Sequence, residues 1–222
     1  MVSGLPHRRW AGPPASPVVL LHSLGEDSST WTDVAQALAV DRPVIAFDLP
    51  GHGDAGPRSA YSFEQIRNEV SAAIEALELD QLSIVGHSLG GMLGYLIAAQ
   101  RPAWLAGLVL EEAPPPLPLD PPRPPPDRPE AELDFDWAAL VALYRERNEP
   151  DPAWWRQLGD IEVPTLVLAG GEESHIDQDQ MARMAERIPD ATVMTIGGGH
   201  HVHTTRPDDF VVAVNRFLTV CS

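Results

Sequence analysis

Short runs of apolar residues alternate along the chain with longer stretches in which apolar residues return every three or four positions. The short runs are rich in valine, leucine and isoleucine, a composition typical of buried strands. They span residues 17–22, 43–49, 82–87, 105–112, 164–170 and 191–196. This alternation predicts an α/β protein with a mostly parallel central sheet that is flanked by helices.

The longer stretches predict the helices between these strands. In residues 63–78 the apolar positions share one helical face, and residues 89–100 are apolar enough for a buried helix. A further helix is marked by Met181, Met184, Ala185 and Ile188. The last helix begins near Pro207 and is expected to bury Phe210, Val211, Val214, Phe217 and Leu218.

One segment interrupts the alternation. Proline occupies 10 of the 16 positions in residues 114–129, which excludes the interior of a helix or sheet. Residues 130–162 predict one or two short helices and contain several aromatic side chains. Because a long insertion in a compact domain is usually a lid or a binding loop, we expect a core of residues 1–113 and 161–222 with an inserted lid over 114–160.

The charge of the chain excludes several classes of function. Its formal net charge is −17, and such an acidic chain is poorly suited to nucleic acid or to an anionic membrane surface. All 15 basic residues are arginines. The absence of lysine excludes a Schiff-base lysine and a P-loop lysine. We therefore expect a small-molecule substrate as the partner of this chain.

Cys221 is the only cysteine, so the chain forms no internal disulfide. The first residues show neither the basic start nor the apolar run of a signal peptide. No apolar stretch approaches the ~20 residues that a membrane-spanning helix requires. These features favour a cytoplasmic location, and they leave the oligomeric state open.

Gly86-His87-Ser88-Leu89-Gly90 matches the pattern G-x-S-x-G between a predicted strand and a predicted helix. A serine on such a sharp turn needs small neighbours, which Gly86 and Gly90 supply. The turn lifts the Ser88 hydroxyl above the sheet and leaves the Leu89 N–H at the start of a helix, where it can face an oxyanion. We therefore predict that Ser88 is a nucleophile. The alternative is a glycine-rich turn that contains an idle serine.

A serine nucleophile needs a base, and a histidine-rich loop follows the last predicted strand. Its residues Gly199, His200, His203 and Pro207 fall on the spacing G-H-x-x-H-x-x-x-P, and here the chain resembles the α/β-hydrolase family. The resemblance assigns the base to His200. His201 is the rival by adjacency, and His203 is interpreted as a packing or hydrogen-bonding residue.

The same histidines could be read as metal ligands. No carboxylate lies at a helical spacing from them, so we expect no metal site and no cofactor.

The resemblance extends over nearly the whole chain, since residues 18–31 look like the family's strand and H-G-x-G oxyanion loop and residues 47–55 like its D-x-P-G-x-G turn. It implies that the Leu24 N–H is the second oxyanion donor. Ser23 stands where the family usually has glycine, and its side chain either tilts this peptide or adds a hydroxyl donor. Only about sixteen residues precede the first clear strand, so we expect an N-terminally shortened sheet.

The acid that orients the histidine has two candidates. The family's usual position after the seventh strand falls on Glu173, whereas some members take the acid from the end of the sixth strand, which falls on Glu112. We favour Glu112, because a strand end holds a side chain more rigidly than a loop does. Glu111 should point to the opposite face of the sheet and serve a structural role.

These features together predict a cofactor-independent serine hydrolase that cleaves an ester or lactone of a small apolar substrate through an acyl-enzyme. The alternatives are a lyase or cyclase that uses the same Ser-His pair, and a non-catalytic receptor on the same fold. We expect Ser23, His87, Trp137, Tyr144 and Trp154 to contact the substrate. Carboxylates of the lid would disfavour anionic substrates if they face the site, namely Asp127, Glu130, Glu132, Asp134 and Asp136.

Overall fold

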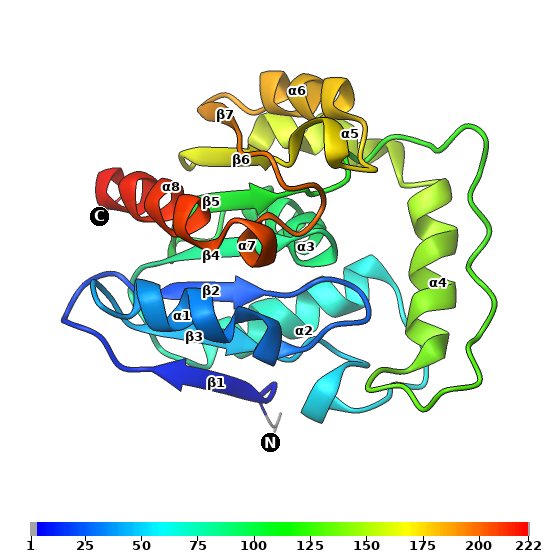
Figure 1. The fold of residues 1–222 in the computed structure, drawn as a ribbon, viewed down its shortest axis with the longest axis horizontal. Helices are drawn as coiled ribbons and strands as arrows, with labels where there is room; N and C mark the ends of the chain where they lie inside the picture. The colour runs from blue at the N-terminus through cyan, green and yellow to red at the C-terminus, as the bar shows by residue number, and fades with distance from the viewer. Residues whose placement is uncertain (1–3, 222) are drawn as a thin grey trace.

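The computed structural model describes residues 4–221, and a seven-stranded sheet forms its centre (Figure 1). The strands are β1 (His7–Trp10), β2 (Val18–Leu21), β3 (Val44–Phe47), β4 (Leu82–His87), β5 (Leu105–Glu111), β6 (Thr165–Ala169) and β7 (Ala191–Thr195). Their order in the sheet is β1-β3-β2-β4-β5-β6-β7. All neighbours are parallel except β1, which pairs antiparallel with β3.

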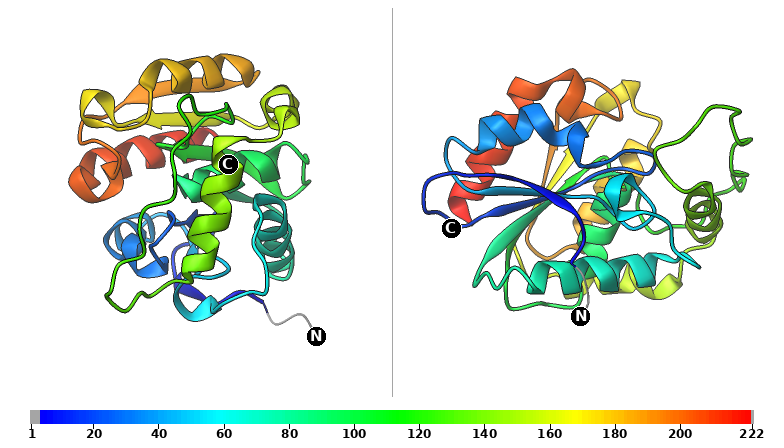
Figure 2. Two further views of the ribbon diagram at one scale, coloured as in Figure 1. Left: turned by 90° about the vertical axis from the view of Figure 1, so that its right-hand side faces the viewer. Right: turned by 90° about the horizontal axis from the view of Figure 1, so that it is seen from below.

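Helices cover both faces of the sheet (Figure 2). They are α1 (Thr32–Leu38), α2 (Phe63–Glu75), α3 (Leu89–Ala98), α4 (Trp137–Asn148), α5 (Pro152–Gln157), α6 (Gln178–Arg187), α7 (Val202–Thr205) and α8 (Pro207–Val220). Helices α1 and α8 pack on one face, and α2, α3 and α6 pack on the other. Val18 and Leu20 of β2 contribute to the first layer of the core, and Val19 and Leu21 contribute to the second. This burial on both sides explains why the strands are continuous apolar runs.

The predicted fold class is confirmed: the sheet is mostly parallel and lies between helices. Each strand expected between residues 17 and 196 forms within two residues of its predicted bounds. No strand is predicted before residue 17, whereas β1 forms the edge of the sheet there. Two of its residues are exposed, so it lacks the apolar run that marks the other strands.

The proline-rich residues 114–129 contain no helix or strand. The chain leaves the sheet after β5 and returns at β6, and in between α4 lies beyond the carboxyl ends of the strands (Figure 1). Asp136 begins α4, and its carboxylate accepts hydrogen bonds from the Ala138 N–H and from the Tyr61 hydroxyl. Residues 134–136 also pair through their backbone with the loop at 51–53. The insertion is thus attached to the core at the start of α4.

Among the helices of residues 4–221, none combines the length and apolar character needed to cross a membrane.

Candidate active site

Ser88 lies on a strained turn between β4 and α3. Its φ of 49° lies in the left-handed region, which non-glycine residues rarely adopt. The turn is so tight that a Cβ on Gly86 would lie 2.3 Å from the Gly90 carbonyl oxygen, and a Cβ on Gly90 would lie 2.1 Å from that of Leu21. Only glycine fits at these two positions, which is the steric reason for the G-x-S-x-G spacing.

His200 and Glu112 form an ion pair beside this turn. His200 Nδ1 lies 3.3 Å from Glu112 Oε2, and the Glu112 side chain is completely buried at the end of β5. The carboxylate also accepts hydrogen bonds from the Ser174 hydroxyl, the Gly170 N–H and the Gln178 amide. Burial alone would raise the pKa of Glu112, but these hydrogen bonds outweigh it and the pKa is lowered. Glu112 is therefore a fixed, ionised partner for the histidine.

The rival acid and the rival base lie elsewhere. Glu173 is exposed, and within residues 4–221 no hydrogen bond or ion pair joins it to His200. The His201 side chain is half-exposed, and its Nε2 lies 3.3 Å from Glu26 Oε1 rather than near Glu112. The geometry thus favours Glu112 over Glu173 and His200 over His201.

Glu111 and His203 form a second, separate pair. Both side chains are completely buried, and His203 Nδ1 lies 2.9 Å from both carboxylate oxygens of Glu111. The His203 backbone N–H donates to the same carboxylate. Glu111 therefore holds the histidine-rich loop against β5.

Ser88 and His200 border one cavity of about 300 Å³. Within the described part of the chain no hydrogen bond joins the Ser88 hydroxyl to His200, a spacing that is common in enzymes without bound substrate. Apolar side chains from the core and from the insertion supply most of the other walls, among them Leu24, Phe63, Met92, Leu119, Leu140, Leu143 and Ile176.

Two backbone N–H groups at this cavity have no hydrogen-bond partner among residues 4–221. They belong to Leu89, the first residue of α3, and to Leu24 in the loop after β2. The neighbouring Ser23 N–H is occupied, because it donates to Glu26 Oε2 at 3.1 Å. Leu24 and Leu89 therefore offer the two free donors that a developing oxyanion requires.

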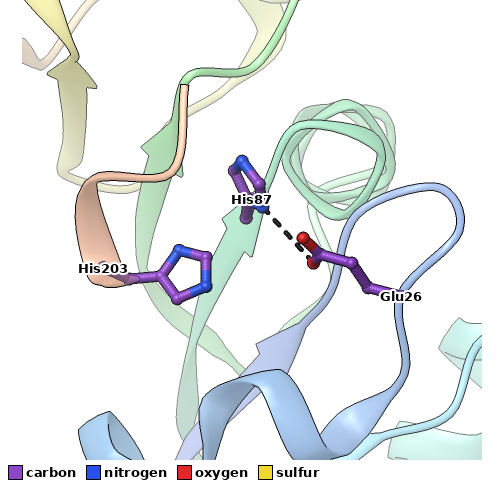
Figure 3. A group of neighbouring side chains, drawn as sticks. All are labelled: Glu26, His87 and His203. Carbon is purple, nitrogen blue, oxygen red and sulfur yellow. Dashed lines mark ion pairs between the residues drawn. The ribbon is translucent and has the colours of Figure 1, made fainter. Parts of the chain in front are cut away.

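Glu26 connects the three segments that carry these groups. Besides accepting the Ser23 N–H, its carboxylate lies 3.6 Å from His87 Nδ1 in the serine turn (Figure 3). It also lies 3.3 Å from His201 Nε2 in the histidine-rich loop. Burial would raise the pKa of Glu26, but His87 and the Ser23 N–H lower it to about 2. The pKa of His87 is lowered by burial but raised more strongly by Glu111 and Glu26. The pair is thus an ionic tie between the loops.

Glu26 and His87, together with His203, form a group of side chains that could bind a metal ion, although no metal site was expected. Ligand atoms of Glu26, His87 and His203 all lie within 4.8 Å of one another, so this group could hold a cation. Helical spacing alone does not reveal this group, because Glu26 lies in a loop far upstream of the two histidines. His87 Nε2 donates to the His200 carbonyl oxygen at 2.8 Å, whereas its buried Nδ1 has no hydrogen-bond partner within the described residues.

Of the five residues predicted to contact the substrate, two line the cavity and three do not. Ser23 and Tyr144 line the cavity. His87 is completely buried behind it. Trp137 packs near Phe135 and Trp154 packs edge-on against Phe63, so neither indole borders the cavity.

Several residues at the site were not predicted. Ser174 and Gln178 contact Glu112, Glu26 contacts His87 and His201, and Arg147 lines the cavity. They lie in loops and at helix ends, where no periodicity indicates which way a side chain points. A possible signal was the position of Glu26 directly after the oxyanion loop.

Comparison with known proteins agrees with this geometry. The model of the alpha/beta hydrolase family matches residues 18–214. The chain is 35% identical over 152 residues to the 2-succinyl-6-hydroxy-2,4-cyclohexadiene-1-carboxylate synthase of Enterobacter sp. (strain 638), a match that covers 66% of this chain and 55% of that protein. The chain thus spans about half the length of this relative.

Two solved structures share the fold over nearly their whole length. The enol-lactonase from Burkholderia xenovorans LB400 superposes with a TM-score of 0.82 at 22% identity, covering 97% of this chain and 96% of that one. A hydrolase from Pseudomonas aeruginosa PA01 also gives 0.82 at 22% identity, covering 96% and 93%. The chain belongs to the α/β-hydrolase family, as its motifs predicted.

Proposed function

We propose that this protein is a cofactor-independent serine hydrolase that cleaves an ester or lactone. One observation supports this above the others: the Glu112–His200 ion pair borders the same cavity as Ser88 on its strained turn. In this mechanism the Ser88 hydroxyl attacks the substrate carbonyl and gives its proton to His200. Glu112 holds the ring in the required tautomer and stabilises the imidazolium, while the Leu24 and Leu89 N–H groups bind the oxyanion.

The second half of the reaction uses the same residues. His200 returns the proton to the leaving alcohol, and the acyl group stays on Ser88. Water then attacks the acyl-enzyme with His200 as its base and releases the acid. No cofactor enters any of these steps.

A fluorophosphonate tests the nucleophile directly. We expect stoichiometric labelling at Ser88, and loss of labelling in Ser88→Ala and in His200→Ala, because the hydroxyl is unreactive without its base. Peptide mass spectrometry locates the label, and a panel of esters of graded acyl length measures turnover. Labelling of a different residue, or full labelling of His200→Ala, would refute the assignment.

A lyase or cyclase is the second candidate, favoured by the similarity to a protein named as a synthase. In that reaction the Ser-His pair moves protons without an acyl-enzyme. A labelled Ser88 with no ester turnover, but with elimination or ring closure of a test substrate, would identify this class. Tight binding of a small ligand without labelling would instead indicate a receptor.

A further inference from the structure

The cavity beside Ser88 has the opposite charge to the rest of the protein. The chain carries 32 acidic residues and a net charge of −17. Yet the cavity is lined by Arg123, Arg147, His175, His200 and His201, and no aspartate or glutamate of residues 4–221 borders it. In so acidic a protein this segregation points to an anionic ligand.

Among these residues, Arg147 gives the strongest indication of an anionic ligand. It lies in the last turn of α4 and is half-buried, and its guanidinium donates one hydrogen bond, to the Leu117 carbonyl oxygen at 3.2 Å. No carboxylate of the described residues lies within ion-pair distance of it. Burial lowers the pKa of Arg147, but a guanidinium stays charged in proteins. A half-buried cation without a counter-ion costs stability unless a ligand supplies the negative charge.

The end of α4 also forms hydrogen bonds with the proline-rich segment, which borders the same cavity. Asn148 accepts a hydrogen bond from the Arg123 N–H at 2.8 Å and donates one to the Arg123 carbonyl at 2.7 Å. The Leu119 N–H donates to the Asn148 carbonyl at 3.1 Å. These contacts hold the proline-rich segment against α4, so that Leu119 and Arg123 border the same cavity as Arg147.

We propose that the substrate of this site carries a carboxylate, which the Arg147 guanidinium binds while the reacting carbonyl faces Ser88. This rests on the proposed hydrolase function and specifies its substrate class. A guanidinium matches a carboxylate with two parallel N–H···O bonds. One half-buried cation balances one negative charge, and the apolar walls around it suit an aliphatic or alicyclic body. The substrate is therefore an ester or lactone with a carboxylate on its acyl part.

This replaces the expectation that lid carboxylates disfavour anionic substrates. None of the five predicted carboxylates borders the cavity. Asp134 and Asp136 line a separate hollow beside the loop at 51–57. The side of the insertion that faces Ser88 presents arginines instead.

The test compares charged and neutral esters of the same length. The charged probes are mono-para-nitrophenyl esters of linear dicarboxylic acids of increasing length, and the neutral probes are the same compounds with a methyl-capped carboxylate. We expect the wild type to prefer one chain length of the charged series by about tenfold or more in kcat/KM, since a hydrogen bond to a charged group contributes this much. In Arg147→Met this preference should fall by about tenfold.

Two variants control the measurement. Arg145→Met removes an exposed arginine from the same helix and should leave the charged-to-neutral ratio unchanged. Arg147→Lys keeps the charge but loses the planar fork, so its ratio should lie between those of the wild type and Arg147→Met. Thermal unfolding verifies that each variant is folded. Equal turnover of charged and neutral esters by the wild type, or an unchanged ratio in both Arg147 variants, would overturn the proposal.

Calorimetry separates this proposal from the hydrolase function. The free dicarboxylic acids are titrated into Ser88→Ala with and without Arg147→Met. Binding to Ser88→Ala that depends on Arg147, together with no ester turnover by the wild type, would retain the carboxylate subsite and reject the hydrolase. Ester turnover without such binding would reject the subsite and retain the hydrolase. Tighter binding of methyl phosphate than of any dicarboxylate would overturn the choice of a carboxylate.

Discussion

Glu112 combines complete burial with four hydrogen-bond donors. The donors come from His200, Ser174, Gly170 and Gln178, and therefore from three different segments. A buried carboxylate that faces so many donors stays ionised, which is the state that holds a histidine in one tautomer.

Replacement of the two candidate acids by glutamine tests this assignment. Glu112→Gln should lower kcat by about a thousandfold or more, because the amide cannot hold the His200 tautomer or stabilise the imidazolium. Glu173→Gln is the matched control and should keep near-full kcat, since Glu173 is exposed and does not contact His200 within the described residues. Steady-state kinetics on the best ester measures both. Near-full kcat in Glu112→Gln would show that Glu112 is not the acid.

The pairing of Glu26 with His87 should make the free energy of unfolding depend on pH. The pKa of Glu26 is about 2 in the folded protein against an ordinary value of 4.5, so its stabilising contribution is complete above pH 4.5 and is lost as the pH falls toward 2. The raised pKa of His87 gives a contribution that is complete below pH 6.5 and is lost as the pH rises above it. The difference in free energy of unfolding between the wild type and Glu26→Gln should therefore be largest between pH 4.5 and 6.5.

Urea unfolding at pH values below, within and above this window measures that difference. Glu64→Gln is the control, because its exposed ion pair with Arg67 contributes at most about 1 kcal/mol. A difference for Glu26→Gln that stays constant as the pH falls toward 2 would contradict the ionic tie.

At the residue scale, sequence identified the serine and the histidine more firmly than the acid. Ser88 and His200 lie in patterns that sterics and spacing constrain, whereas Glu112 and Glu173 both follow strands. Only the three-dimensional distances distinguish them. Glu26 and Arg147 could not be predicted, because their partners are loop backbone or a cavity, to which no sequence periodicity corresponds.

At the scale of elements, burial on both faces made most of the sheet predictable. Strands β2 to β6 are almost entirely buried, so each one is a continuous apolar run that ends at a turn residue. Strand β1 has two exposed arginines and pairs on one side only, so its sequence resembles a loop. The edge of the sheet was missed for that reason.

The insertion shows how far composition can predict an element. Its prolines excluded regular structure in residues 114–129, and the helical pattern that follows predicted α4 and α5. The aromatic residues suggested a substrate-binding face, and Tyr144 of α4 does border the cavity, beside Leu140, Leu143 and Arg147. Trp137 and Trp154 pack on other side chains instead, because indoles bury the most area where they meet another ring.

At the scale of the molecule, net charge described the surface and not the site. The value of −17 argued against nucleic acid and an anionic membrane surface, and the carboxylates of the lid were expected to disfavour anionic substrates if they faced the site. The cavity at the carboxyl ends of the strands is nevertheless lined by arginines and histidines. A fold that gathers arginines and histidines from the segments after β5, β6 and β7 can give one cavity a charge that the whole chain does not have.

The attachment of α4 to the core should control substrate affinity. The Tyr61 hydroxyl donates to Asp136 at 2.7 Å, and Glu146 accepts the Phe63 N–H at 2.9 Å. Burial and this hydrogen bond raise the pKa of Tyr61 to about 12, so the hydroxyl remains a donor through the neutral range. The two contacts join both ends of α4 to the start of α2 and so hold Leu140 and Leu143 over the cavity.

Loss of both contacts is expected to loosen this wall without touching the reacting groups. Each hydrogen bond contributes about 1 kcal/mol, so Tyr61→Phe combined with Glu146→Met, which has no carboxylate oxygen to accept the Phe63 N–H, should raise KM by up to about tenfold and change kcat less. Steady-state kinetics on the preferred ester measures the two constants, and Glu64→Gln on α2 serves again as the control because its carboxylate faces Arg67. An unchanged KM in the folded double variant would mean that the position of α4 does not depend on these contacts. A fall in kcat at constant KM would place their effect on the chemical step, because uniform substrate binding changes KM alone.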